Sequence, residues 1–208
     1  MPPVNFRLLL VTDRRQTGGR SLPSVLHDAI HAGLPAVQLR ERDLSTRELL
    51  LLAQELRSIT APRAVPLIIN DRVDLMMALN LNGVHLRANS LPVSAVRRLA
   101  GADRLVGIST HSAAEVREAN RDGADYVVFG PIFDTPSKRS FGSPVGLEQL
   151  AEVCRLSAVP VFAIGGITPA SVSDVRRAGA HGVAVIGAIL AHDNAAAATR
   201  EMLAALAA

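Results

Sequence analysis

The sequence predicts an α/β protein, a (β/α)8 TIM barrel formed by a single domain that spans residues 1–208. Short apolar runs alternate with polar segments of helical period along the whole chain, which is typical of β/α units around a parallel sheet. No linker interrupts this alternation. A glycine also precedes several of the apolar runs, as in HAGLPAVQL and RAGAHGVAVIG, where a helix C-cap is favoured.

The apolar runs predict strands at residues 7–12, 35–40, 65–70, 83–86, 104–109, 125–130, 159–164 and 182–187. Helices are expected between them, among others at 45–59, 92–100, 112–122, 146–156 and 169–178. A doubly wound sheet is the alternative, but its nucleotide-binding form carries G-x-G-x-x-G after the first strand, where this chain has Asp13, Arg14 and Arg15. The barrel is therefore favoured, and its functional residues should lie at the carboxyl ends of the strands.

The composition excludes several classes of protein. Because 49% of the residues are hydrophobic and no apolar run approaches about eighteen residues, we expect a cytoplasmic protein with no membrane partner. The single cysteine, Cys154, excludes an internal disulfide, and no Cys/His spacing suggests zinc. The net charge of +3 is dispersed and aromatic residues make up only 3%, so no nucleic acid is expected as a partner. The surplus positive charge suits anionic small molecules.

Two glycine-containing strand ends predict a phosphate site. The run VPVFAIGGI ends at Gly165 and Gly166, before a helix start at Thr168, and VAVIGA contains Ile186 and Gly187. Glycines let a backbone approach a ligand closely, and N–H groups at a helix start attract phosphate. The loops after the seventh and eighth strands of a barrel frequently build such a site. The alternative is that these are ordinary strand-to-helix turns.

Polar residues at other strand ends should meet at the same mouth. Gln38 and Arg40 are two residues apart and face the same way, so the guanidinium can bind a phosphate or carboxylate. Asn70 and Ser109 end the third and the fifth of the predicted strands. A structural salt bridge from Arg40 to Asp71 is the alternative.

His111 follows a strand end and suits proton transfer, although it could instead be a neighbour of a helix-capping Ser112. His85 lies within a strand and is interpreted as a buried, hydrogen-bonded core residue. The long irregular segment 131–144 contains Thr135, Ser137 and Lys138, which could enclose an anion. A solvated basic loop is the alternative.

Seven motifs occur in order along nearly the whole chain: QLRER (38–42), INDRVDL (69–75), GVHL (83–86), GISTH (107–111), DYVVFGPIFDTPSK (125–138), AIGGI (163–167) and GVAVIGAI (182–189). Together they resemble the thiamin phosphate synthase/TenI family. The resemblance implies a (β/α)8 barrel whose small-molecule partner is the thiazole phosphate half of thiamin.

This family holds two activities. The synthase couples a pyrimidine diphosphate to the thiazole phosphate, releases pyrophosphate and uses magnesium held by two aspartates, of which the first corresponds to Asp71. The second should end a segment resembling HLGQED, but the chain reads HLRANS and has Ser90 there, with Arg87 in place of a glycine. A hydroxyl is a poor replacement for a carboxylate on a hard cation, and a guanidinium repels the ion. The lysine expected in QLREK is also replaced, by Arg42.

TenI-type members resemble this chain in the R-E-R segment, in a serine at position 90 and in a histidine equivalent to His111. Their reaction is a thiazole tautomerisation, a proton shift that gives the aromatic thiazole phosphate carboxylate and requires no metal or other cofactor. The segment TPSK (135–138) instead favours the synthase, because it is close to that enzyme's T-P-T-K pyrophosphate loop.

The first hypothesis is therefore a cofactor-free thiazole tautomerase, in which His111 moves the proton, the glycine turns hold the phosphate, and Arg40 with Lys138 meets the carboxylate. The second is thiamin phosphate synthase with magnesium on Asp71, and Arg40, Asn70, Ser109, Thr135, Ser137 and Lys138 around the pyrophosphate. The third is a non-catalytic protein that binds a thiamin-pathway phosphate. The sequence leaves the oligomeric state open, a homodimer included.

Overall fold

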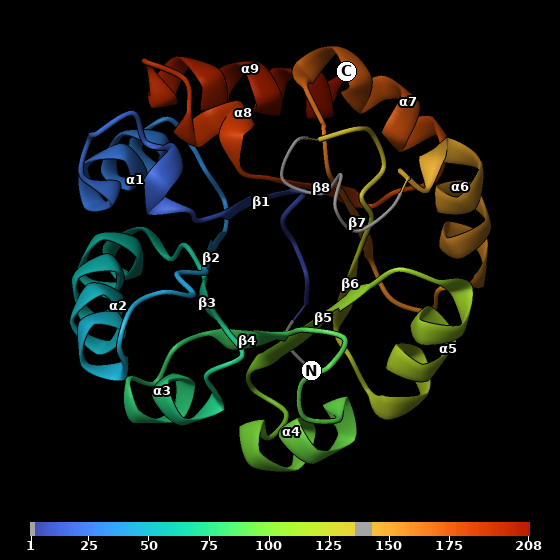
Figure 1. The fold of residues 1–208 in the computed structure, drawn as a ribbon, viewed down its shortest axis with the longest axis horizontal. Coiled ribbons are helices and arrows are strands. Elements are labelled where there is room, and N and C mark those ends of the chain that lie inside the picture. The colour runs from blue at the N-terminus through green and yellow to red at the C-terminus, as the bar shows by residue number, and fades with distance from the viewer. Residues whose placement is uncertain (1–2, 136–142) are drawn as a thin grey trace.

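The computed structural model describes residues 3–135 and 143–208, and shows eight parallel strands closed into a barrel with helices around it (Figure 1). Each strand pairs with its neighbours in sequence, and β1 closes the barrel against β8. The predicted (β/α)8 barrel is therefore confirmed. The strands are β1 (Leu8–Val11), β2 (Val37–Leu39), β3 (Leu67–Asn70), β4 (Gly83–Leu86), β5 (Leu105–Thr110), β6 (Tyr126–Phe129), β7 (Val161–Ile164) and β8 (Gly182–Val185).

The helices pack outside the strands. They are α1 (Leu22–His31), α2 (Thr46–Thr60), α3 (Val73–Ala78), α4 (Val93–Ala100), α5 (Ala113–Asp122), α6 (Gly146–Leu156), α7 (Val172–Arg177), α8 (Gly187–Leu190) and α9 (Ala195–Ala207), with 3₁₀ turns at Arg14–Gln16, Ala61–Arg63 and Pro169–Ser171. Each strand lies within a residue or two of its expected ends. One boundary is corrected: Gly187, expected in the last strand, begins α8, because the backbone leaves the extended conformation at Ile186 (φ −120°, ψ −87°).

Local sequence explains where several helices begin and end. The Ser45 hydroxyl accepts the Glu48 N–H while the Glu48 carboxylate accepts the Ser45 N–H, which forms a capping box at the start of α2. Ser112 caps α5 in the same position, and Gly123 ends that helix in the left-handed conformation (φ 86°) that glycine adopts without steric cost. Ser112 is thus the cap beside His111 that the sequence suggested.

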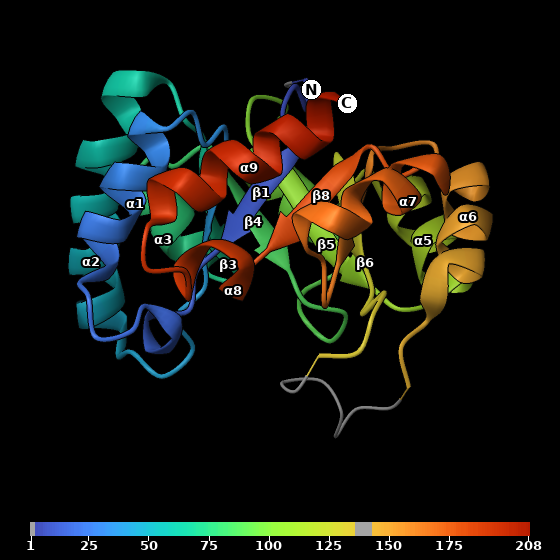
Figure 2. The same cartoon turned by 90° about the horizontal axis from the view of Figure 1, so that it is seen from above.

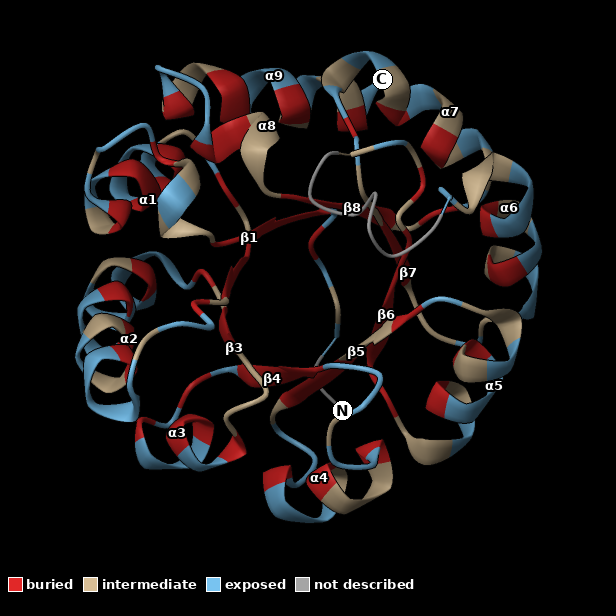
Figure 3. Cartoon of the chain, viewed as in Figure 1, coloured by how far each residue is buried: buried red, intermediate tan, exposed pale blue. Residues whose placement is uncertain are grey.

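Alternation along the strands separates two apolar layers. One layer fills the barrel and includes Leu9, Tyr126 and Phe162, while the other lies between strands and helices and includes Leu8 and Leu10. Figure 3 shows that most strand residues are buried, whereas the surrounding helices carry buried residues among exposed and intermediate ones. Such a packed interior leaves the rim of the barrel as the place for a site.

The two rims of the barrel carry different parts of the chain. In Figure 2 both termini lie at one end, whereas α8 and the loop after β4 lie at the other, where the strands terminate. None of the helices within residues 3–135 and 143–208 has both the length and the apolar character needed to cross a membrane.

Candidate functional site

A cavity of about 350 Å³ opens at the carboxyl ends of the strands. Most of the predicted site residues line this one cavity: Gln38, Arg40, Asn70, Ser109, His111, Thr135, Gly165, Gly166, Ile186 and Gly187. Ser137 and Lys138 lie outside the described residues. The structure therefore gathers residues from β2 to β8 around a single space, as the strand-end argument predicted.

One wall of the cavity consists of the turns after β7 and β8. Gly165 and Gly166 have positive φ angles of 102° and 65°, a conformation in which other residues are strained. Gly187 and Ala188 are the first residues of α8, so their N–H groups have no carbonyl partner within the helix. This wall offers backbone donors without a side-chain charge, which is the chemistry that the sequence predicted for a phosphate cradle.

The glycine pair also receives the loop that follows β6. The Ile132 N–H donates to the Ile164 carbonyl (2.8 Å) and the Phe133 N–H to the Gly165 carbonyl (3.0 Å). A Cβ on Gly166 would lie 2.7 Å from the Asp134 carbonyl oxygen. The glycines are thus required by this close backbone approach, whatever ligand the turn holds.

The opposite wall is cationic. Arg40, Arg42 and Arg87 line the cavity from the ends of β2 and β4. Burial, with the neighbouring Arg42 charge, lowers the pKa of the half-buried Arg40 from its usual value. An arginine still remains charged at neutral pH. Within residues 3–135 and 143–208, Arg40 forms no ion pair, so its guanidinium is available to an anion.

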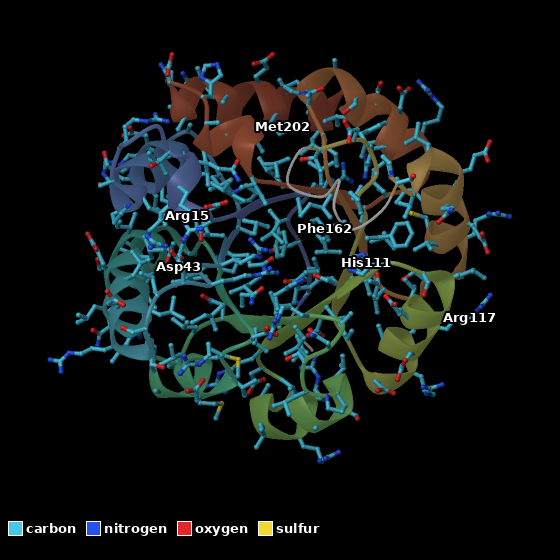
Figure 4. The ribbon with its side chains drawn as sticks, viewed as in Figure 1. Arg15, Asp43, His111, Arg117, Phe162 and Met202 are labelled. Carbon is cyan, nitrogen blue, oxygen red and sulfur yellow. The ribbon has the colours of Figure 1, made fainter. Side chains whose placement is uncertain are left out.

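A network of ion pairs supports this wall from behind. The Arg14 guanidinium contacts Glu41 (3.2 Å) and Asp43 (2.6 Å), and Arg15 contacts Asp43 (2.6 Å). Figure 4 shows Arg15 and Asp43 side by side between α1 and α2. The hydrogen bonds to Arg14 hold the pKa of Asp43 below its usual range. Because Glu41 is buried in this network, alternation along the chain directs Arg40 to the other side, toward the cavity.

Asp71 pairs with Arg87, not with Arg40. The Arg87 backbone N–H donates to Asp71 Oδ1 (3.0 Å), and the Arg87 guanidinium pairs with Oδ2. Both carboxylate oxygens are therefore used within the chain. The alternative of an Arg40–Asp71 salt bridge is wrong, because the loop after β4 brings Arg87 over this carboxylate.

A row of hydrogen-bonded polar side chains crosses the floor of the cavity. The Gln38 amide donates to Asn70 Oδ1 (3.2 Å). His85 Nε2 lies 2.9 Å from Ser109 Oγ, and Nδ1 lies 3.2 Å from the Tyr126 hydroxyl. Burial lowers the His85 pKa to about 3. The Asp71 charge raises this pKa and the Arg40 charge lowers it, both to a smaller extent. His85 is thus buried and hydrogen-bonded, as the sequence indicated, and it also lines the cavity.

His111 is held by its backbone and by one ring nitrogen. Its N–H donates to Glu115 Oε2 (2.6 Å), and Nδ1 lies 2.7 Å from the Gly130 carbonyl oxygen. Because a carbonyl only accepts, Nδ1 carries a proton here. A neutral His111 then has an unprotonated Nε2, which can act as a base at the cavity wall.

Several cavity residues, Gln16 and Arg87 among them, were not among the predicted site residues. Gln16 follows β1, and its side chain lies against Gly187 on the cavity wall. The polar run DRRQ directly after the first apolar run was the available signal, by the same strand-end rule. Arg87 was predicted as a charge that repels a metal ion, and the structure places it in the cavity.

Comparisons with known proteins identify the family. A family model described as thiamine monophosphate synthase matches residues 8–189, a range that includes every cavity residue. The chain belongs to this family. One member, thiamine-phosphate synthase of Chloroflexus aurantiacus, is 44% identical over 199 residues, which cover 96% of this chain and 92% of that protein. Another, from Clostridium botulinum (strain Loch Maree), is 40% identical over 200 residues, 96% and 98% of the two chains.

A solved structure of the family shares the fold. Thiamine phosphate pyrophosphorylase from Pyrococcus furiosus superposes with a TM-score of 0.88 at 30% identity, over 97% of this chain and 95% of that chain. The resemblance to the thiamin phosphate synthase/TenI family is therefore confirmed at the level of the family.

The first prediction concerns Gly166. A Gly166→Ala variant should lose stability, because the added Cβ meets the 133–134 backbone and the positive φ strains alanine, at a cost of about 1–3 kcal/mol or more. Urea unfolding measures the loss. The matched control is Gly123→Ala, which has a positive φ of 86° but no atom within 4 Å of the added Cβ. Equal losses in both variants would show that the contact with the β6 loop is unimportant.

The second prediction concerns the neutral state of His85. Its pKa is depressed in the folded chain, from 6.5 to about 3, so the unfolded state binds more protons between these values. The stability contributed by neutral His85 is therefore present above pH 6.5 and lost as the pH falls toward 3. Urea unfolding from pH 7 to pH 4 should show a smaller difference between wild type and His85→Asn at the lower pH. Parallel pH profiles would contradict the assignment.

Proposed function

We propose that the protein is a thiamine-phosphate synthase, an enzyme that couples hydroxymethylpyrimidine diphosphate to thiazole phosphate. The observation that carries this proposal is a single cavity with an arginine wall at β2 and β4 and a glycine wall at β7 and β8. In a closed eight-stranded barrel these two walls face one another. Two phosphorylated substrates can therefore bind with their anionic groups apart and their reacting rings between them.

The residues take complementary roles in this proposal. Arg40 and Arg87 meet the diphosphate by charge-assisted hydrogen bonds, with Ser109 and Asn70 beside them. Ser137 and Lys138 are assigned to the same diphosphate by the family resemblance. The N–H groups of Gly166, Gly187 and Ala188 bind the single phosphate of the thiazole.

The reaction that this arrangement supports is a substitution at the pyrimidine methylene carbon. The C–O bond to the diphosphate breaks, and its electron pair leaves with pyrophosphate. The thiazole nitrogen lone pair forms the new C–N bond, which leaves the ring positively charged. The arginine wall stabilises the charge that develops on the leaving group.

The described residues do not fit the magnesium site that the family resemblance implies. Asp71 is occupied by Arg87, and Ser90 does not line the cavity but an adjoining pocket beside α4 and α5 that shares Arg87 and Ser109 with it. No group of three or more His, Cys, Asp or Glu side chains in the described parts of the chain could hold a metal ion. We therefore derive no step through a metal, and assign the compensation of diphosphate charge to the arginines.

The names of the relatives favour the synthase over the tautomerase, which the sequence analysis placed first. The third prediction follows. Purified protein incubated with both substrates should form thiamin phosphate and pyrophosphate in equal amounts, and Arg40→Gln should lower the rate by at least about tenfold, because a charged hydrogen bond is lost from the leaving group. Product formation is followed by chromatography across a magnesium titration that includes EDTA. The absence of product at every magnesium concentration would exclude the synthase.

The thiazole tautomerase remains the second candidate, and the Asp71–Arg87 pair is the observation that favours it. A proton shift needs no metal, and His111, whose Nδ1 lies 2.7 Å from the Gly130 carbonyl oxygen, lines the cavity. Solvent deuterium uptake into the thiazole carboxylate phosphate tests it, with His111→Gln as the variant. If neither reaction occurs while thiazole phosphate still raises the melting temperature, a binding-only function is favoured.

The fourth prediction concerns the same ion pair. In Arg87→Gly the Asp71 carboxylate is freed and a positive charge is removed, so affinity for Mg²⁺ should rise above that of wild type. Isothermal titration calorimetry with MgCl₂ alone measures it. The control is Arg72→Gly, which removes an arginine that pairs with Asp74 instead. Equal Mg²⁺ affinity in wild type and Arg87→Gly would show that Arg87 does not shield Asp71.

A further inference from the structure

A chain of hydrogen bonds runs from the inside of the barrel to the cavity. It begins at the Tyr126 hydroxyl on β6, passes through the His85 ring on β4 and ends at the Ser109 hydroxyl on β5. Tyr126 is fully buried and His85 is 2% exposed, whereas Ser109 lines the cavity. His85 also lines the cavity, but of these three residues Ser109 is the one that is not buried, so it presents the most surface to a ligand.

The interior of the barrel has room for these hydrogen-bonded side chains because position 107 is a glycine. Position 107 precedes Ser109 on the same face of β5, and a Cβ there would overlap the Tyr126 ring. Glycine at 107 thus makes room for the tyrosine beside His85. Burial raises the pKa of Tyr126 and lowers that of His85, so both groups stay uncharged at neutral pH.

The protons in this chain can be arranged in two ways. If His85 carries its proton on Nε2, the tyrosine O–H donates to Nδ1 and the His85 N–H donates to Ser109. If the proton is on Nδ1, the tyrosine must accept it. Its own O–H then has no acceptor within the described residues, since His85 is its single hydrogen-bond partner there. A buried donor without a partner costs about 1–3 kcal/mol, so the Nε2–H form is favoured.

We infer that Tyr126 and His85 act as positioning residues that make Ser109 a hydrogen-bond donor to a phosphate oxygen in the cavity. Because Ser109 Oγ accepts from His85, the Ser109 O–H is directed to a ligand. The hydroxyl therefore selects a ligand that offers a hydrogen-bond acceptor. The register aligns β4 and β5 so that Leu86 is opposite Ile108, which places Arg87 beside Ser109. The ligand at this wall is therefore anionic, and this inference rests on the proposed diphosphate-using function.

The location of the His85 proton is tested first. Protein labelled with ¹⁵N-histidine is examined by long-range ¹H–¹⁵N NMR at neutral pH, and the His85 signals are assigned by their loss in His85→Asn. The expected result is a neutral ring with the proton on Nε2. A proton on Nδ1 would overturn the inference, because Ser109 would then have to donate to His85.

The action through Ser109 is tested by a double-mutant cycle on binding of inorganic pyrophosphate, at one fixed magnesium concentration. Tyr126→Phe should weaken binding about two- to tenfold, the worth of one ordered hydrogen bond. Ser109→Ala should weaken it at least as much, and the double variant should bind no worse than Ser109→Ala alone. The control is Thr110→Val, whose hydroxyl faces away from the cavity toward the Val128 carbonyl.

Additive losses in the cycle, or an unchanged affinity in Tyr126→Phe, would overturn the inference, because tyrosine would then not act through Ser109. Neither NMR nor pyrophosphate binding needs turnover. If His85 carries its proton on Nε2 and the losses are coupled, but no thiamin phosphate forms, the proposed synthase function is wrong and this inference still holds.

Discussion

The pairing of β8 with β1 is the contact on which the site depends. Leu8, Leu9 and Leu10 align with Val183, Ala184 and Val185 and close the sheet into a barrel. The close approach requires glycine at 182, since a Cβ there would overlap the Arg7 carbonyl. Closure brings the glycine wall of β7 and β8 opposite the arginine wall of β2 and β4. In an open sheet these walls would lie apart and could not line one cavity.

Charge is arranged around the cavity by selective pairing. Glu41 and Asp43 neutralise Arg14, and Asp71 neutralises Arg87 in part, whereas Arg40 has no ion-pair partner within residues 3–135 and 143–208. A half-buried guanidinium without a partner is costly in the free protein. An anionic ligand would remove that cost, which is consistent with the phosphorylated substrates that we propose.

The synthase and tautomerase hypotheses use the same cavity for different reasons. Both need an anchor for the thiazole phosphate, which the β7 and β8 turns can supply. They differ at the arginine wall, which would hold a departing diphosphate in one case and a carboxylate in the other. Family members named as synthases at 40–44% identity favour the first. The pairing of Asp71 with Arg87 is the local feature that departs from the metal chemistry implied by the resemblance.

The sequence by itself determined the strands, the barrel and many of the polar residues that line the cavity. Apolar periodicity and glycine placement are local properties, and the carboxyl ends of parallel strands must meet whatever the details of packing. The partners of individual side chains were decided by the tertiary structure. Asp71 contacts Arg87 and not Arg40, and His85 joins Tyr126 to Ser109, because such pairs depend on loop paths and on register between strands. Spacing along the chain does not contain those distances, which only the closed barrel defines.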